Sequence, residues 1–262
     1  MKAVDRNNVK VLGAGERTLM FAHGYGCDQN MWRHVTPAFQ ADYKIVLFDY
    51  VGSGHSDTSS FDRTKYSTLH GYSHDVLDII DELDLKRVDF VGHSVSSMIG
   101  ALAAIEQPER FETLTMIGPS PSYINDGDYV GGYERSDIES LLHTLESNHL
   151  GWSAAMAPAI MGNPESPELT QELEASFCRM DPEIAYHFAR VTFLSDNRVD
   201  LPRLPTRTLI LQCQKDVIAG LTVGEYVHQC LPKSQLVVMD ATGHCPHMSA
   251  PGEVIAELRK FL

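Results

Sequence analysis

Three residues whose side chains can act together in nucleophilic catalysis are spread along the chain: Ser94, Asp216 and His244. A serine hydroxyl is a poor nucleophile at neutral pH, so it needs a histidine to take its proton and a carboxylate to orient that histidine. The chain order of serine, acid and histidine is one in which such triads recur. We therefore predict Ser94 as the nucleophile, His244 as the base and Asp216 as the orienting acid.

The sequence around Ser94 is typical of a nucleophile elbow. An apolar run at 88–91 leads directly into GHSVS, and a helical pattern at 95–105 then ends before Pro108. Such a strand, sharp turn and helix expose the serine hydroxyl and direct the N–H of Val95 toward an oxyanion formed at Ser94. Ser96 occupies the position of the second glycine of the usual G-x-S-x-G pattern, which weakens the motif without removing it.

Alternatives exist for both the base and the orienting acid. His247 follows His244 by three residues, and Asp240 could replace Asp216. We favour His244 because it directly follows Gly243 in the loop after the last apolar run. We favour Asp216 because Asp240 lies too near the histidine in sequence. Loops at the carboxyl ends of parallel strands are where open α/β sheets bind their ligands.

A second glycine-rich turn follows the apolar run at 18–22 and reads His23-Gly24-Tyr25-Gly26. Its glycines let the backbone N–H of Tyr25 approach a bound carbonyl oxygen. We therefore predict an oxyanion hole made by the backbone N–H groups of Tyr25 and Val95, with the tyrosine ring as a pocket wall.

The elements that would position these residues are short apolar runs alternating with helical patterns such as 72–83. This alternation predicts an α/β fold, with a mostly parallel sheet and helices on both faces. The predicted strands are 9–12, 18–22, 45–48, 88–91, 114–117, 208–211 and 236–239.

The alternation stops between residues 123 and 197. Helical patterns at 138–145 and 169–177 follow there, and we expect them to be interrupted at Gly151, Pro158, Pro164 and Pro182. We interpret this segment as a helical lid inserted into a single domain whose core is 1–122 and 198–262. Its large apolar side chains either face a pocket or fill the insertion's own small core; they are Trp152, Met156, Phe177, Phe188 and Phe193.

Composition excludes several classes of partner. The formal net charge of −14 argues against binding to nucleic acid or to an anionic membrane surface. No stretch approaches the ~18 apolar residues of a membrane span, and the first residues do not read as a signal peptide. The five cysteines are scattered without C-x-x-C spacing, which argues against disulfides and a structural zinc site. We expect a cytoplasmic protein that needs no metal or organic cofactor.

Four motifs together resemble the RsbQ-like α/β-hydrolases, a family of bacterial stress-response regulators, and the similar plant karrikin and strigolactone receptors. The motifs are GYGCDQ at 24–29, DYVGSGHS at 49–56, GHSVS at 92–96 and GHCPHMS at 243–249. The resemblance implies an α/β-hydrolase fold with a sheet of the eight-stranded type, a cap of four helices, the triad named above and a mostly apolar pocket.

The same resemblance bears on the pocket. The family's pocket positions match Tyr25, Val95, Tyr123, Trp152 and Phe193 of this chain. Relatives often carry phenylalanine at the positions of Tyr25 and Tyr123. With Met156 from the helical insertion, the predicted substrate pocket comprises Tyr25, Tyr123, Trp152, Met156 and Phe193.

We expect a serine hydrolase that cleaves a small, mostly apolar ester or lactone through an acyl-enzyme. The similarity to RsbQ implies a stress-signalling role and a sensor-domain phosphatase as partner. Two alternatives remain open: a ligand receptor with slow turnover that recruits a protein, and a metabolic esterase or carbon–carbon bond hydrolase.

Overall fold

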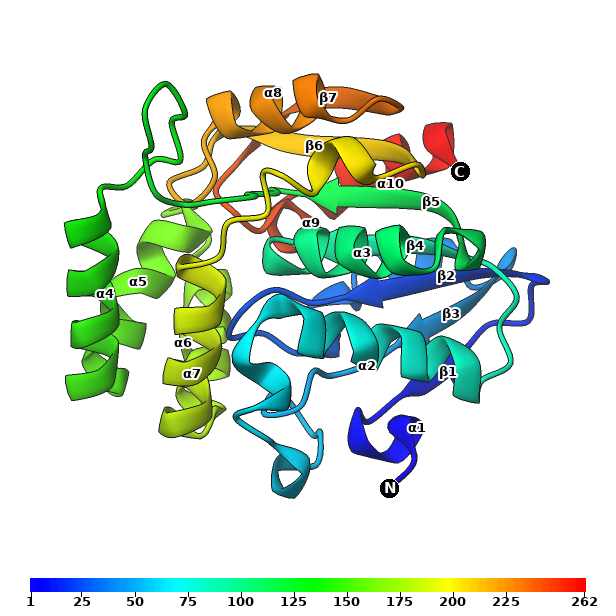
Figure 1. Cartoon of the computed structure of the whole chain (residues 1–262), viewed down its shortest axis with the longest axis horizontal. Helices are drawn as coiled ribbons and strands as arrows, with labels where there is room; N and C mark the ends of the chain where they lie inside the picture. The colour runs from blue at the N-terminus through cyan, green and yellow to red at the C-terminus, as the bar shows by residue number, and fades with distance from the viewer.

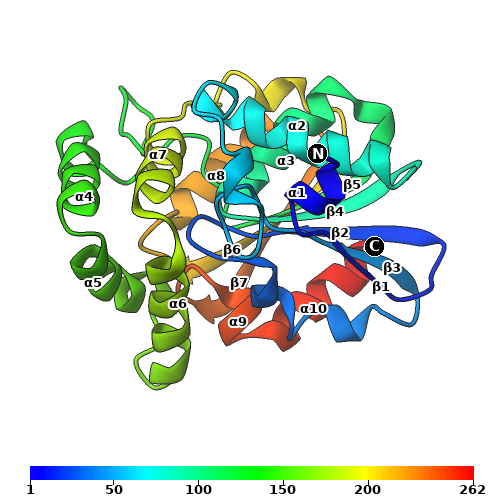
Figure 2. The same cartoon turned by 90° about the horizontal axis from the view of Figure 1, so that it is seen from below.

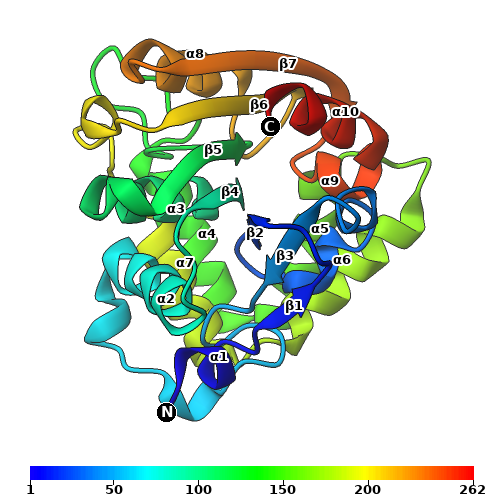
Figure 3. The same cartoon turned by 90° about the vertical axis from the view of Figure 1, so that its right-hand side faces the viewer.

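A computed structural model describes all residues, Met1–Leu262, and its centre is a seven-stranded sheet with the order β1-β3-β2-β4-β5-β6-β7. β1 is antiparallel to β3, and all other neighbours are parallel. Figure 3 shows the strong twist across these strands. The strands are β1 (Lys10–Leu12), β2 (Arg17–Ala22), β3 (Tyr43–Leu47), β4 (Val88–His93), β5 (Phe111–Ile117), β6 (Arg207–Lys215) and β7 (Ser234–Thr242).

The predicted mostly parallel sheet is confirmed, and each predicted strand overlaps an observed one. The expectation of an eight-stranded sheet was wrong, because the residues before β1 form a short helix, α1 (Ala3–Arg6), instead of a further strand. A turn with Asn8 at φ 45° then leads into β1, which is therefore the edge of the sheet.

Helices cover both faces of the sheet, as Figures 2 and 3 show. On one face lie α2 (Leu69–Glu82), α3 (Val95–Glu106) and α8 (Leu221–Cys230); on the other lie α9 (Pro246–Ser249) and α10 (Pro251–Phe261). Alternate residues of β2 enter different apolar clusters, Met20 in one and Leu19 and Phe21 in the other. This alternation is what a strand buried on both faces produces. No helix of the chain combines the length and the apolar character needed to cross a bilayer.

Short 3₁₀ helices join several of these elements. They are η1 (Gln29–Trp32), η2 (Thr36–Ala38), η3 (Thr58–Ser60), η4 (Lys65–Ser67), η5 (Pro108–Arg110) and η6 (Leu201–Arg203).

Four helices between β5 and β6, here called the insertion helices, lie beyond the carboxyl ends of the parallel strands (Figure 1). They are α4 (Arg135–Ser147), α5 (His149–Met161), α6 (Pro167–Arg179) and α7 (Pro182–Phe193). The sequence predicted helix within α4 and α6 but not the extent of α5 and α7.

Two of the expected interruptions inside these helices were wrong. Pro158 lies within α5, where the residue four positions earlier, Ala154, is exposed, so water can bond the carbonyl that loses its partner. Gly151 lies in the first turn of α5, and its N–H donates to the Asn148 side chain at 3.0 Å. Pro182 is the first residue of α7. Its missing N–H costs little there, because the N–H groups of the first helical turn have no partner within the helix.

Candidate active site

Ser94 lies at a sharp turn between β4 and α3. Its backbone has φ 56° and ψ −123°, a conformation that is strained for any residue other than glycine. The turn is held by a hydrogen bond from the Ser94 N–H to the carbonyl of Ile117, at 2.8 Å. A Cβ at Gly92 would lie 2.5 Å from the Ser96 carbonyl oxygen, so glycine is needed there for the strand to enter the turn. The predicted strand, turn and helix are therefore present.

The three residues predicted to act together lie in contact. His244 Nε2 is 2.7 Å from Ser94 Oγ, and His244 Nδ1 is 2.7 Å from Asp216 Oδ2. Asp216 Oδ1 accepts hydrogen bonds from the backbone N–H groups of Ile218 and Ala219. Because the carboxylate can only accept from Nδ1–H, it fixes the tautomer in which Nε2 presents a lone pair to the serine hydroxyl.

The sheet topology explains why residues so distant in sequence meet. Ser94 follows β4, Asp216 follows β6 and His244 follows β7, all at the carboxyl edge of the sheet. Gly118, after β5, lies directly behind them, since a Cβ there would be 3.1 Å from the His244 ring. An insertion helix also holds the His244 loop, because the backbone N–H of His244 donates to the Ile160 carbonyl of α5 at 2.8 Å.

The alternative base and acid lie elsewhere. His247 is fully buried, its ring centroid is 4.6 Å from that of Trp32, and neither ring nitrogen has a hydrogen-bond partner. Burial lowers its pKa to about 3. Asp240 is exposed on β7, and its N–H donates to Glu253. The structure thus brings His244 and Asp216 to Ser94, and neither alternative.

Ser96, which departs from the usual glycine, has a defined structural use. Its hydroxyl donates to the His23 carbonyl at 2.5 Å and pairs with the Tyr50 hydroxyl at 2.9 Å. His23 in turn accepts from the Tyr50 N–H through Nε2 and donates to the Gly24 carbonyl through Nδ1. These buried hydrogen bonds join the elbow to the loop after β2 that carries Tyr25.

The backbone N–H groups of Tyr25 and Val95 have no hydrogen-bond acceptor within the chain. Val95 begins α3 directly after Ser94, where helix N–H groups have no partner in the helix. The Tyr25 loop reaches the serine through Gly24, at which a Cβ would lie 3.3 Å from the Ser94 Cβ. Both N–H groups are therefore available to a charged oxygen beside Ser94.

An apolar cavity with a volume of about 30 Å³ opens at Ser94, beneath the insertion helices. The residues that line it are Tyr25, Cys27, His93, Ser94, Tyr123, Trp152, Ile160, Leu173, Phe177, Thr192, Phe193, Ile218, His244 and Cys245. Four of the five predicted pocket residues are among them. Met156 is not: its partly exposed side chain packs against the apolar cluster outside the cavity, and Ile160 of the same helix lines the cavity instead.

Sequence reasoning missed several lining residues, among them Cys27, Leu173 and Ile218. A signal existed for Ile218 and Cys245, which lie within two residues of the predicted acid and base. No local signal existed for Leu173, because its position depends on how α6 packs onto the core.

Aromatic rings largely fill the cavity. The Tyr25 ring lies between 5.7 and 6.2 Å, centroid to centroid, from four rings of the insertion helices: Trp152, Phe177, Phe188 and Phe193. Its hydroxyl donates to the Ala185 carbonyl of α7 at 3.1 Å. The remaining volume holds one or two water molecules, whereas sites for small ligands usually measure several hundred Å³. A small molecule of ordinary ligand size would therefore fit this cavity only if these rings moved.

Tyr123 supplies a polar group at the edge of this cavity. Burial raises the pKa of the Tyr123 hydroxyl, while an interaction with Ser94 lowers it in part. The hydroxyl is therefore protonated at neutral pH and can donate a hydrogen bond beside the serine.

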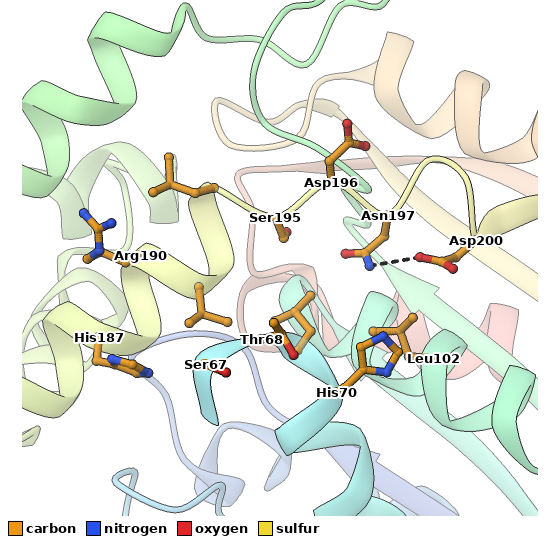
Figure 4. A pocket seen from close by; sticks show the side chains of 13 residues that line it. Ser67, Thr68, His70, Leu102, His187, Arg190, Ser195, Asp196, Asn197 and Asp200 are labelled. Carbon is orange, nitrogen blue, oxygen red and sulfur yellow. Dashed lines mark hydrogen bonds between the residues drawn. The ribbon is translucent and has the colours of Figure 1, made fainter. Parts of the chain in front are cut away.

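A larger and more polar hollow lies away from Ser94, between the start of α2 and the end of α7 (Figure 4). Its volume is about 460 Å³, and polar residues such as His70, Arg190 and Asp196 line it. None of Ser94, Asp216 and His244 borders this hollow, so size alone does not identify the active site.

Comparisons with known proteins agree with this fold. A model described as "Alpha/beta hydrolase family" matches residues 19–258. The karrikin insensitive 2 receptor CA of Petunia hybrida is 39% identical over 259 residues, covering 98% of this chain and 96% of that protein. A strigolactone esterase of Arabidopsis thaliana is 38% identical, covering 97% and 96% respectively.

A solved structure of a hydrolase from Oleispira antarctica is also similar. It shares 45% identity with this chain, has a TM-score of 0.96, and the match covers 99% of this chain and 95% of that one.

Proposed function

The chain belongs to the alpha/beta hydrolase family, and we propose that it is a serine hydrolase acting on a small, mostly apolar ester or lactone. The observation that carries the proposal is the continuous chain of contacts from Asp216 through His244 to the Ser94 hydroxyl, each 2.7 Å long. Esterases among the relatives support the choice of reaction.

In the proposed mechanism, His244 takes the Ser94 proton as Oγ attacks the carbonyl carbon of the substrate. Asp216 stabilises the imidazolium that forms, and the N–H groups of Tyr25 and Val95 bind the oxyanion. His244 then returns the proton to the leaving alcohol oxygen. Water, activated by the same histidine, hydrolyses the acyl-enzyme and restores the free serine.

We further propose that residues 123–197 act as a lid on a core formed by 1–122 and 198–262. Support comes from the position of the insertion helices over the cavity and from the contacts of Ile160 and Ala185 with the core. Five free cysteines fit a reducing compartment, so we assign the protein to the cytoplasm.

The experiment that tests the proposal measures hydrolysis of p-nitrophenyl acetate by the wild type, Ser94→Ala and Asp216→Asn. We expect a rate constant lower by at least about 10³-fold in Ser94→Ala and a large loss in Asp216→Asn, as in other enzymes with such triads. Exposed Ser140→Ala, on α4, is the control and should retain full activity. Unchanged hydrolysis in Ser94→Ala would refute the assignment.

A second candidate function is a ligand receptor that turns over slowly and recruits a protein partner. The names of relatives that are 39% and 38% identical, both karrikin insensitive 2 receptors, and the nearly filled cavity favour it. An RsbQ-like stress-signalling role, with a sensor-domain phosphatase as partner, is a narrower form of this candidate and rests on the motif resemblance.

The receptor function predicts that a lactone alters amide hydrogen exchange across α4–α7, and does so even in Ser94→Ala, which cannot turn the ligand over. Exchange changes confined to the residues around Ser94 would favour a metabolic hydrolase instead.

A further inference from the structure

A cluster of buried nitrogen and sulfur groups lies directly behind the Ser94–His244 pair. It comprises His93, Cys245 and His247, whose ligand-type atoms all lie within 4.8 Å of one another. All three residues are at most 2% exposed. The proposed hydrolysis uses none of these side chains.

The two histidines of the cluster carry unpaired nitrogens. His93 Nε2 lies 2.8 Å from the His244 carbonyl oxygen and must donate to it, which leaves a lone pair on Nδ1. His93 Nδ1 and both ring nitrogens of His247 have no hydrogen-bond partner. Buried polar atoms without a partner are costly and rare. Because a neutral imidazole has one lone pair, His93 Nδ1 and one nitrogen of His247 can each offer a lone pair to an occupant.

The two rings and the thiol converge beside the active-site cavity. The His93 and His247 ring centroids are 4.4 Å apart, so the rings are near enough to share one ion. His93 and Cys245 also line the active-site cavity, which provides a route of entry.

We propose that His93, Cys245 and His247 form a site for a transition-metal ion of the Zn²⁺ type. Two imidazole nitrogens and one thiolate are ligands that Zn²⁺ prefers, and a water molecule from the cavity can complete a tetrahedral set. On binding, the Cys245 S–H bond breaks, an S–metal bond forms, and the proton leaves to solvent. The thiolate offsets one of the two positive charges of the ion.

Occupation of this site would inhibit hydrolysis. His93 and Cys245 line the small cavity at Ser94, and the water that completes the metal's ligand set would lie in it. The ion and its water would then occupy space that the carbonyl group of a substrate must enter. The site would therefore make the hydrolase sensitive to Zn²⁺, a property that the proposed function does not itself require.

The test is a titration of metal-free protein with Co²⁺, a spectroscopic substitute for Zn²⁺, followed by absorption. We expect saturation at one Co²⁺ per chain, with a thiolate-to-metal charge-transfer band in the near ultraviolet and intense visible bands of a tetrahedral site. Cys245→Ser should lose the charge-transfer band, and His247→Asn should bind at least about tenfold more weakly. Cys178→Ser, which changes a cysteine outside the cluster, should behave as the wild type.

Ser94→Ala separates this proposal from the proposed function, because it should bind Co²⁺ normally whether or not Ser94 is the nucleophile. In the wild type, added Zn²⁺ should slow ester hydrolysis, and in His247→Asn the inhibiting concentration should rise at least about tenfold. The absence of saturable binding in the wild type would overturn the proposal, whatever the fold of the variants. A charge-transfer band that persists in Cys245→Ser would overturn it as well.

Discussion

The backbone N–H of His244 donates a 2.8 Å hydrogen bond to the carbonyl oxygen of Ile160, near the end of α5. The loop that presents the proposed base is therefore held by an insertion helix as well as by β7. A second contact reinforces the first, because the Asn163 side chain donates to the Thr242 hydroxyl at 3.2 Å. Any displacement of α5 would therefore also displace the proposed base.

Gly243→Ala tests this coupling. Gly243 has φ 82°, and a Cβ there would overlap the Met161 carbonyl oxygen at the end of α5. We expect the substitution to displace the His244 loop, to lower the hydrolysis rate at least about tenfold, and to cost roughly 1–3 kcal/mol of stability. Ester kinetics and thermal unfolding measure the two effects. Gly252→Ala, in the first turn of α10 where a Cβ would meet nothing within 4 Å, is the control. It should leave the hydrolysis rate unchanged and should not lower stability, because an unstrained Gly→Ala change in a helix raises it by up to about 1 kcal/mol.

Ser96→Ala tests the buried hydrogen bonds beneath the elbow. The substitution leaves the His23 carbonyl and the buried Tyr50 hydroxyl without their partner. We expect a loss of about 1–3 kcal/mol in the free energy of unfolding, measured by urea denaturation. Exposed Ser140→Ala should lie within about 0.5 kcal/mol of the wild type. Equal stability of the two variants would contradict the structural use assigned to Ser96.

Tyr25→Phe tests whether the cavity must open before a substrate binds. It removes the hydrogen bond to the Ala185 carbonyl of α7, worth about 1 kcal/mol, which corresponds to about a fivefold larger open population. We expect kcat/KM for bulky esters to rise severalfold, while that for p-nitrophenyl acetate changes less. Tyr186→Phe, on the same helix but with no hydroxyl hydrogen bond, should leave both values unchanged. Equal effects of the two variants would contradict a role for the Tyr25 hydroxyl in keeping the cavity closed.

Acid should destabilise the protein before its carboxylates titrate. Burial lowers the pKa of His23, His93 and His247, to about 3 for His247. Because the unfolded chain takes up protons at these residues more readily than the folded one, their stabilisation is complete above the unfolded pKa of about 6.5 and is lost as pH falls below it.

His93 and His247 each contribute a slope of up to about 1.4 kcal/mol per pH unit between about pH 6 and 5, so the two together contribute up to about 3, and His23 adds a smaller amount. Urea denaturation across this range measures the slope. His247→Asn should reduce the slope by up to about 1.4 kcal/mol per pH unit, which is the contribution of one proton. A stability that is flat from pH 7 to 5 would contradict the burial of three neutral histidines.

Local patterns in the sequence predicted much of the fold and of the site. Ser94 follows a buried strand in a recognisable elbow, and Asp216 and His244 follow later strands, so strand prediction places all three at one sheet edge. The seven strands were found because alternation and β-branched residues are local signals.

Other features depend on contacts between distant segments. Pro158 is tolerated inside α5 because that part of the helix faces solvent, which the sequence does not reveal. Met156 lies outside the cavity while Ile160 lines it, a difference set by how α5 packs on its neighbours. The cluster of His93 with Cys245 and His247 arises only because β4 and the loop after β7 converge at the same sheet edge.

The most direct test of the central claim is the intact mass of the protein after treatment with a fluorophosphonate, which reacts with an activated serine. The proposal predicts one adduct per chain in the wild type, none in Ser94→Ala, and much slower labelling in His244→Ala, where the serine has lost its base. An adduct that persists in Ser94→Ala would contradict Ser94 as the nucleophile.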